Sequence, residues 1–164
     1  IFAEFVLLAR EKGIPTLVDA AGPPLMAALE AGPTVVKADH RFMSKVMGRS
    51  LTSLDNLIDV VSGFQAKGVE WAVVSYRTYG NVFFSPDGIY LALADRKSVR
   101  SIFSASDALL AGLVVAREEG MTTEETIRFA MASAWECAAH VGKGIQNRKA
   151  VEGFIPLVEL EHLS

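Results

Sequence analysis

The chain has 164 residues, of which 51% are hydrophobic and 21% are charged, and its formal net charge is −3. With a mean hydropathy of +0.30, this composition excludes a disordered chain and predicts a buried core, while the lack of a basic surplus argues against a nucleic-acid partner. The single cysteine, Cys137, excludes an internal disulfide and fits a reducing cytoplasm, and no apolar run approaches the length of a membrane span.

The first part of the chain alternates between helical and strand-like patterns. Apolar residues at helical spacing predict a helix from Phe2 to Lys12. Because the chain begins inside this pattern, we expect that it is a piece of a longer protein or that preceding residues are missing. Short apolar runs predict strands at 15–19, 34–37 and 71–75. Between them, helices are predicted at 25–31, from the cap Asp39 to Met47, and from Ser53 or Asp55 to Ala66.

The second part begins with a predicted hairpin, residues 81–93, whose turn is Pro86-Asp87-Gly88. Val99 to Phe103 is predicted to form a short strand that leads into a tight turn at 104–106 and then a helix ending at Gly120. Thr122 or Thr123 is predicted to cap the next helix, with Glu124 or Glu125 completing a capping box, and this helix runs to about Ala139. A last helical turn at 150–154 and an extended segment at 158–160 complete the pattern.

This alternation predicts an α/β fold with a mostly parallel sheet and one antiparallel hairpin. Ligands of such sheets bind beyond the carboxyl ends of the strands. The polar loops that we expect at this edge of the sheet are Asp19, residues 37–39, residues 75–80 and residues 104–107. Four loops at one edge would form a plausible binding site.

The turn before the helix at 107–120 suits phosphate chemistry. Ser106 and Asp107 are both good N-cap residues, and the N–H groups of a first helical turn bind anions. A carboxylate beside such an anion site can accept the proton of an attacking hydroxyl, as phosphoryl transfer requires. The alternative interpretation is a capped core helix without catalytic function.

Five segments carry a resemblance to a known family. They are Gly13–Gly22, which ends in Asp-x-x-Gly; Leu25–Lys37; Val73-Val74-Ser75 with Gly80; Phe103–Gly112; and Glu152–Leu160. In order and spacing the whole chain resembles roughly the C-terminal half of the ribokinase-like carbohydrate kinases, the PfkB family. The likeness is greatest to the branch of 1-phosphofructokinase and tagatose-6-phosphate kinase.

The resemblance implies a three-layer α/β/α fold in which residues 1–164 form the C-terminal, nucleotide-binding part and the N-terminal part is absent. It implies transfer of the γ-phosphoryl group of ATP to a sugar or sugar phosphate, with Mg²⁺ as the metal. Asp107 falls on the family's catalytic base and Ser104, Ala105 and Ser106 on its anion hole. Lys37, Asp39, Ser75 and Gly80 fall on nucleotide- or phosphate-binding positions.

Several positions depart from the family pattern. Ser104 and Ser106 replace the two signature glycines, Arg77 replaces a glycine of the nucleotide loop, and Lys143 replaces a threonine. Arg77 and Lys143 are either phosphate contacts or solvated loop charges. Asp39 stands on the family's asparagine, and Phe42 stands where an acidic residue is expected. Lys37 and Asp39 can equally be a strand end and a helix cap.

Two functions therefore remain open, with a plain α/β scaffold that has neither function as the third alternative. The first is an ATP-dependent kinase for a sugar or sugar phosphate, cytoplasmic and compatible with a homodimer, of which this piece alone turns over little substrate. The second is a degenerate, non-catalytic relative that binds a nucleotide or a sugar phosphate. The three histidines have no metal-like spacing, so we expect no residue of this chain to coordinate the metal directly.

Overall fold

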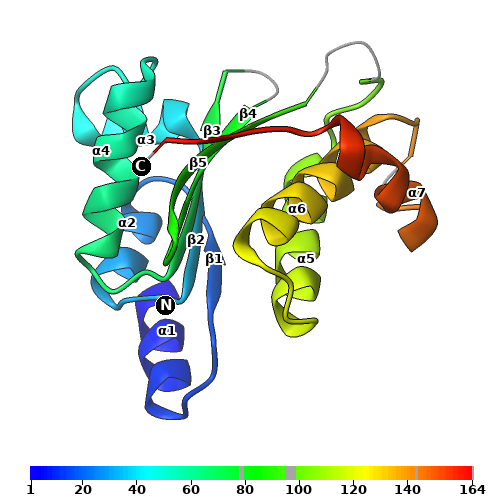
Figure 1. Cartoon of the computed structure of the whole chain (residues 1–164). Coiled ribbons are helices and arrows are strands. Elements are labelled where there is room, and N and C mark those ends of the chain that lie inside the picture. Colours follow the sequence, from blue (N-terminus) through cyan, green and yellow to red (C-terminus); the bar gives the residue numbers. More distant parts are fainter. Residues whose placement is uncertain (78–79, 95–98, 143, 164) are drawn as a thin grey trace. The chain divides into compact units, whose positions relative to one another are not determined.

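The computed structural model describes residues 1–77, 80–94, 99–142 and 144–163. The chain divides into two compact units, Ile1–Tyr90 with His162–Ser164, and Leu91–Glu161. The strands form one sheet in the order β1-β2-β3-β4-β5-β6, coloured from blue to red in Figure 1. The alternating pattern of the sequence thus gives the predicted α/β class.

The first unit begins with α1 (Phe2–Glu11), β1 (Leu17–Asp19), α2 (Pro23–Glu30) and β2 (Val35–Ala38). It continues with α3 (His40–Met47), α4 (Leu54–Gln65), β3 (Trp71–Tyr76) and β4 (Gly80–Ser85), and β5 (Gly88–Leu93) begins in it. Strands β1, β2 and β3 are parallel neighbours, and β4 pairs with β3 in the antiparallel sense. The sheet is therefore mixed, and its antiparallel pair β3–β4 was not predicted, while β4 and β5, which form the predicted hairpin, are neighbours in the order of the sheet.

Reciprocal hydrogen bonds fix where β1 and β2 begin. The N–H of Thr16 donates to Thr34 Oγ1 at 3.0 Å, and the N–H of Thr34 donates to Thr16 Oγ1 at 3.2 Å. This pair sets the register in which Asp19 lies beside Lys37 at the other end of the two strands. The threonine hydroxyls thus position a polar pair that matters for the site.

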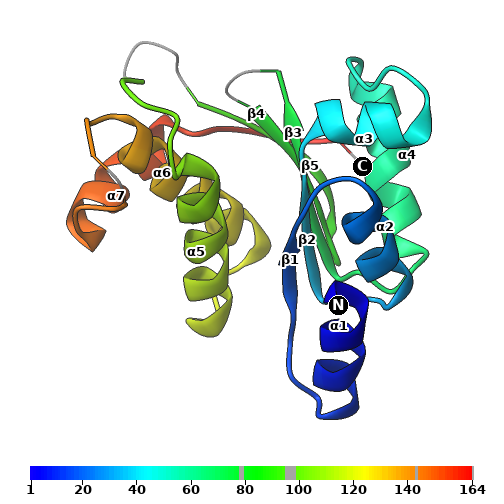
Figure 2. The same cartoon turned by 180° about the vertical axis from the view of Figure 1, so that it is seen from behind.

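Helices α2, α3 and α4 lie on one face of the sheet in both views (Figures 1 and 2). α4 packs against β3 and β4, and α1 packs against α2. The core of this unit is aliphatic and aromatic, and its fully buried members include Leu29, Val36, Leu57, Val73 and Phe83. Burial of these side chains is the main force that holds the unit together.

The second unit consists of α5 (Ala105–Glu118), α6 (Thr123–Ala138), α7 (Arg148–Phe154) and the 3₁₀ turn Ile155–Leu157, and most of β6 (Glu159–His162) follows. α5 and α6 lie side by side, and Gly112 is the point of close approach. A Cβ atom on Gly112 would lie 2.5 Å from Ser133 Oγ and 3.1 Å from the Cα of Ala130. Only glycine fits there without moving α6.

Local capping chemistry sets most of the helix starts. The side chains of Asp39 and Ser53 cap α3 and α4, and Thr122 and Glu125 form the complete capping box of α6. These caps confirm the predicted ones and select Ser53, Thr122 and Glu125 from the predicted alternatives. Asn147, which was not predicted as a cap, starts α7 at Arg148 because its Oδ1 accepts the N–H of Ala150 at 3.0 Å.

Two predictions were wrong. Val99–Phe103 forms no strand, because the N–H groups of Arg100 and Ser101 donate to the carbonyl of Ala138 at 2.7 and 3.0 Å and so bind the end of α6. The N-cap of α5 is Ser104, so neither Ser106 nor Asp107 caps it, and Asp107 lies within its first turn.

No helix in the described ranges is both long enough and apolar enough to cross a bilayer.

Candidate functional site

The turn that starts α5 has an unusual backbone. Ser104 is in the left-handed region, with φ 62° and ψ 0°, and its side chain makes no capping hydrogen bond. For a non-glycine residue this conformation has a steric cost of about 1–2 kcal/mol. The resemblance predicts glycine at this position, and its backbone does have the left-handed conformation that glycine adopts freely. Ser106 lies inside the helix and carries no such requirement.

Asp107 lies in the first turn of α5, and its side chain is exposed. Its carboxylate makes no hydrogen bond or ion pair with any residue that the structure describes. A negative charge in a first turn is favoured by the partial positive charge of the helix N-terminus. The carboxylate is therefore held next to N–H donors but remains available to a ligand.

At the sheet, the carboxyl ends of β1 and β2 carry an ion pair. Lys37 Nζ lies 3.3 Å from Asp19 Oδ2, and the Lys37 side chain is only 12% exposed. The parallel register puts the two residues directly opposite each other. The ammonium group of Lys37 is therefore fixed at the end of the sheet with a carboxylate that partly neutralises it.

Asp39, the next polar residue, is committed to α3. Its Oδ1 accepts the N–H of Arg41 at 2.8 Å, and its Oδ2 lies 2.7 Å from Arg41 Nη2. The hydrogen bonds from the Arg41 side chain are the main reason why the pKa of Asp39 falls to about 2, against the opposing effect of burial. Asp39 thus stays ionised as a helix cap, which was one of its two predicted roles.

The end of β3 contributes Ser75. Its Oγ accepts the backbone N–H of His40 at 3.0 Å and lies 3.0 Å from His40 Nδ1. This contact joins β3 to the start of α3. His40 was not among the predicted site residues. Its position directly after Asp39, just beyond the end of a predicted strand, is the sequence signal that could have identified it.

Gly80 and Arg77 flank the connection that follows β3. Gly80 begins β4 and pairs with Tyr76, while Arg77 has φ 52° and its guanidinium lies 4.9 Å from the Tyr76 ring centroid. Arg77 and Ser104 are the non-glycine residues with positive φ in the described part of the chain. Both residues stand where the resemblance predicts glycine, the residue that adopts a positive φ without steric cost.

The structure thus brings Asp19, Lys37, Asp39 and Ser75 to the carboxyl ends of the parallel strands β1, β2 and β3, as predicted for the polar loops there, and adds His40, which was not predicted. Ser104–Asp107 belong to the second unit and follow no strand. That these residues share the edge of the sheet stays a prediction. Lys143, the other predicted phosphate contact, lies outside the described residues.

Sequence reasoning also missed a buried acid in α6. Glu136 is 2% exposed, and its two carboxylate oxygens accept the backbone N–H of Gln146 at 3.4 and 3.3 Å. His140 Nε2 lies 3.4 Å from Glu136 Oε1. This group ties the segment after α6 back onto the helix. The sequence signal that points to it is Glu136 among the apolar residues at the end of α6, with His140 four positions later, just after the helix.

The profile of the pfkB family carbohydrate kinases matches residues 2–150. The 1-phosphofructokinase of Haemophilus influenzae is 26% identical over 161 residues, which are 98% of this chain and 51% of that protein. The 1-phosphofructokinase of Rhodobacter capsulatus is 32% identical over 141 residues, 86% of this chain and 45% of that protein.

Among solved structures, phosphofructokinase-2 of Escherichia coli in complex with potassium superposes with a TM-score of 0.84 at 20% identity. That superposition covers 94% of this chain and 51% of the other. The likeness establishes a shared fold. The chain spans about half the length of the curated relatives that it matches.

Proposed function

The chain belongs to the pfkB family of carbohydrate kinases, and from this premise we propose that it carries the nucleotide-binding and base-bearing part of a phosphosugar kinase. The reaction is the transfer of the γ-phosphoryl group of ATP to a hydroxyl of a sugar or sugar phosphate. The observation that carries this proposal is the turn at Ser104, which keeps a left-handed backbone directly before an exposed first-turn carboxylate, Asp107. The relatives named 1-phosphofructokinase favour a phosphorylated sugar as the acceptor.

Asp107 is the general base in this proposal. The acceptor oxygen forms a bond to the γ-phosphorus while the bond to the β-phosphate oxygen breaks, and the hydroxyl proton passes to the Asp107 carboxylate. The side chain is suited to this because it has no competing partner among the described residues. Its place in the first turn of α5 puts it beside the donors that stabilise the transferring group.

The N–H groups of Ser104, Ala105 and Ser106 form the proposed anion hole. The Ala105 N–H makes only a long contact of 3.4 Å with the carbonyl of Ile102, which an anionic oxygen can replace. Backbone donors serve whatever side chains they carry, so the two serines do not remove the site. The fit of a phosphoryl oxygen here rests on this turn and on the dipole of α5.

Binding of the nucleotide is assigned to the edge of the sheet. Lys37, with its ammonium group fixed by Asp19, is the proposed phosphate contact, and Ser75, Gly80 and Asp39 lie at the proposed nucleotide positions. Arg77 and Lys143 are assigned as additional phosphate contacts. When bound, Mg²⁺ would reduce the charge of the phosphates, and we assign no residue of this chain as its direct ligand.

We also propose a homodimer in the cytoplasm.

A second candidate is a non-catalytic relative that binds a nucleotide or sugar phosphate. It is favoured by Phe42, which is 47% exposed where the resembling family has an acid, and by the commitment of Asp39 to Arg41. In this candidate the left-handed turn binds an anion, and no transfer follows.

ATP turnover distinguishes the two candidates. ADP release is measured with Mg²⁺ and a panel of hexose phosphates and free sugars, for the chain alone and for the chain combined with the half of the family fold that it does not span. We expect turnover of a hexose phosphate by the combination and little by the chain alone. ATP binding by calorimetry without turnover of any acceptor would instead support the second candidate.

A further inference from the structure

Helix α3 in the first unit carries a surface that is both cationic and apolar. Its one buried residue is Met43, and the helix packs against β3, whereas α4 buries four apolar side chains. Phe42, Val46 and Met47 are 47%, 38% and 40% exposed. We call this surface the α3 face, and its exposed members are Arg41, Phe42, Lys45, Val46, Met47 and Arg49.

The α3 face has a local surplus of positive charge. Residues 40–54 contain Arg41, Lys45 and Arg49 but no Asp or Glu, although the whole chain has a net charge of −3. Arg41 and Arg49 each pair with an aspartate outside this stretch. Lys45 forms no ion pair with any residue that the structure describes. The charge of Lys45, in the middle of the face, is therefore available to an external anion.

The positions of Lys45 and Phe42 combine this charge with the apolar side chains. Lys45 Nζ lies 5.7 Å from the centroid of the Phe42 ring, and Val46 follows Phe42 by one helical turn. The carbon chain of a lysine can lie along apolar groups while its ammonium group stays in polar surroundings. The Phe42 ring and Val46 can therefore enter an apolar layer while the ammonium group of Lys45 remains at the polar boundary of that layer.

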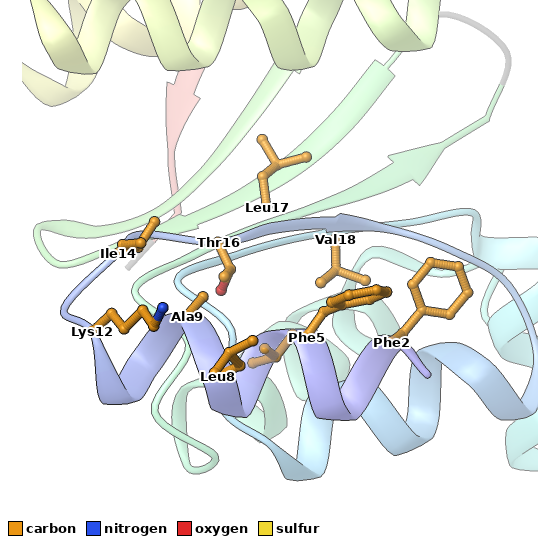
Figure 3. Close-up of a pocket in the computed structure, with 10 residues that line it drawn as sticks. Phe2, Phe5, Leu8, Ala9, Lys12, Ile14, Thr16, Leu17 and Val18 are labelled. Atoms are coloured by element: carbon orange, nitrogen blue, oxygen red, sulfur yellow. The ribbon is translucent and has the colours of Figure 1, made fainter.

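A second exposed apolar surface in this unit, the pocket between α1 and β1, has no such surplus of charge. Figure 3 shows Phe2, Phe5 and Leu8 of α1 at this pocket. The basic side chains in residues 1–14 are balanced by the same number of acidic ones. Of the two surfaces, the α3 face is therefore the one whose charge complements an anionic surface.

We propose that the α3 face binds the surface of a membrane that contains anionic phospholipids. Its basic side chains contact the lipid phosphates, and Phe42 and Val46 enter the headgroup layer. A flat lipid surface suits the outer side of a single helix, which is convex, whereas a bound peptide needs a groove. Binding is weak and reversible, because α3 has only 8 residues.

Membrane binding would affect where the chain acts, and it is independent of the proposed chemistry. α3 begins directly after Asp39 at the edge of the sheet, so binding places this edge next to the lipid surface. Lys45 and Val46 are not among the proposed base, anion hole or nucleotide contacts. Binding can accordingly be measured without any activity, and its failure is distinguishable from failure of the proposed kinase function.

The test is co-sedimentation of the chain with vesicles of phosphatidylcholine alone and of an equal mixture of phosphatidylcholine and phosphatidylglycerol. We expect binding to the mixture only, weakened by added salt, with slowed hydrogen exchange over residues 40–49. Lys45→Glu and Val46→Asp each lower the partition coefficient by at least about fivefold. The matched control is Lys149→Glu, the same change at an exposed lysine of α7, which leaves binding unchanged.

Circular dichroism checks that each variant folds, and because Lys45 and Val46 are both exposed, either variant suffices if the other is unstable. The proposal is overturned if the mixed vesicles do not bind, or if both kinds of vesicle bind equally. Loss of binding with Leu8→Asp but not with Lys45→Glu would place the membrane contact on α1 instead. Binding of polyglutamate that Lys45→Glu abolishes, without binding of either vesicle, would make an acidic polypeptide the occupant.

Discussion

The edge of the sheet in the first unit and the turn that begins α5 in the second handle their polar groups in opposite ways. At the edge of the sheet the charged side chains of Asp19, Lys37 and Asp39 all have ionic partners, since Lys37 pairs with Asp19 and Asp39 binds Arg41. At the turn the backbone of Ser104 is strained, and the Asp107 carboxylate has no partner among the described residues. Polar side chains that are fully paired stabilise the fold. A strained backbone beside an unpaired carboxylate is typical of a ligand-binding site.

The largest effect on stability is expected from Gly112→Ala, which disrupts the close packing of α5, the helix that follows the turn, against α6. The new Cβ would lie 2.5 Å from Ser133 Oγ, and we expect a loss of about 1–3 kcal/mol in the free energy of unfolding. Gly63→Ala is the matched control, because no atom lies within 4 Å of its Cβ position in α4. Urea denaturation should show that Gly63→Ala is neutral or stabilising, and equal losses in both variants would contradict the packing argument.

Glu136→Ala is expected to have the next largest effect. The change removes the carboxylate that accepts the N–H of Gln146 and leaves that donor without its partner, at a cost of about 1–3 kcal/mol. Hydrogen exchange at Gln146 should become faster while exchange in α3 and α4 does not change. Unchanged protection at Gln146 would mean that the segment after α6 is held by other contacts.

At the edge of the sheet, Asp39→Ala is expected to cost about 1 kcal/mol through loss of the cap of α3. The pKa of Asp39 is lowered from 3.8 to about 2 in the folded protein. Its contribution is therefore complete above pH 3.8 and is lost as the pH falls through about 2. Asp39→Ala should remove this acid-dependent loss, as measured by thermal melting between pH 2 and 6. Asp55→Ala, which removes an acid from the first turn of α4, should retain it.

The smallest effects come from the two serines of the turn, and their signs should differ. Ser104→Gly relieves the left-handed backbone and is expected to stabilise the chain by up to about 1 kcal/mol. Ser106→Gly places glycine inside α5 and is expected to destabilise it by about 0.5–1 kcal/mol. Thermal melting of the two variants checks this prediction, and a shift of the same sign in both would show that Ser104 is not strained.

Local chemistry explains what the sequence predicted well. The caps Asp39, Ser53 and Thr122 act on groups within three residues, so their roles are visible in the sequence. The prediction of a strand at Val99–Phe103 was wrong for the opposite reason, because the partners of this segment are distant in the sequence. The N–H groups of Arg100 and Ser101 bind Ala138, a partner far along the chain that no local pattern indicates.

The candidate site divides in the same way. The residue types at the strand ends were predictable, but the pairing of Lys37 with Asp19 depends on the register of two strands, and the contact of Ser75 with His40 depends on where α3 begins. The sequence shows only that Ser104 would be strained if the turn needed a positive φ there. The structure shows that the φ of Ser104 is indeed positive, at 62°.

The most direct test of the central claim is Asp107→Asn, measured in the chain combined with the half of the family fold that it does not span and compared with Asp55→Asn. Both changes remove a first-turn carboxylate at the start of a helix. The account predicts that Asp107→Asn lowers kcat by about 10²- to 10⁴-fold while the Kd for ATP stays within a few-fold, and that Asp55→Asn changes neither. An Asp107→Asn variant that retains the kcat of the unmodified protein would contradict the assignment of Asp107 as the base.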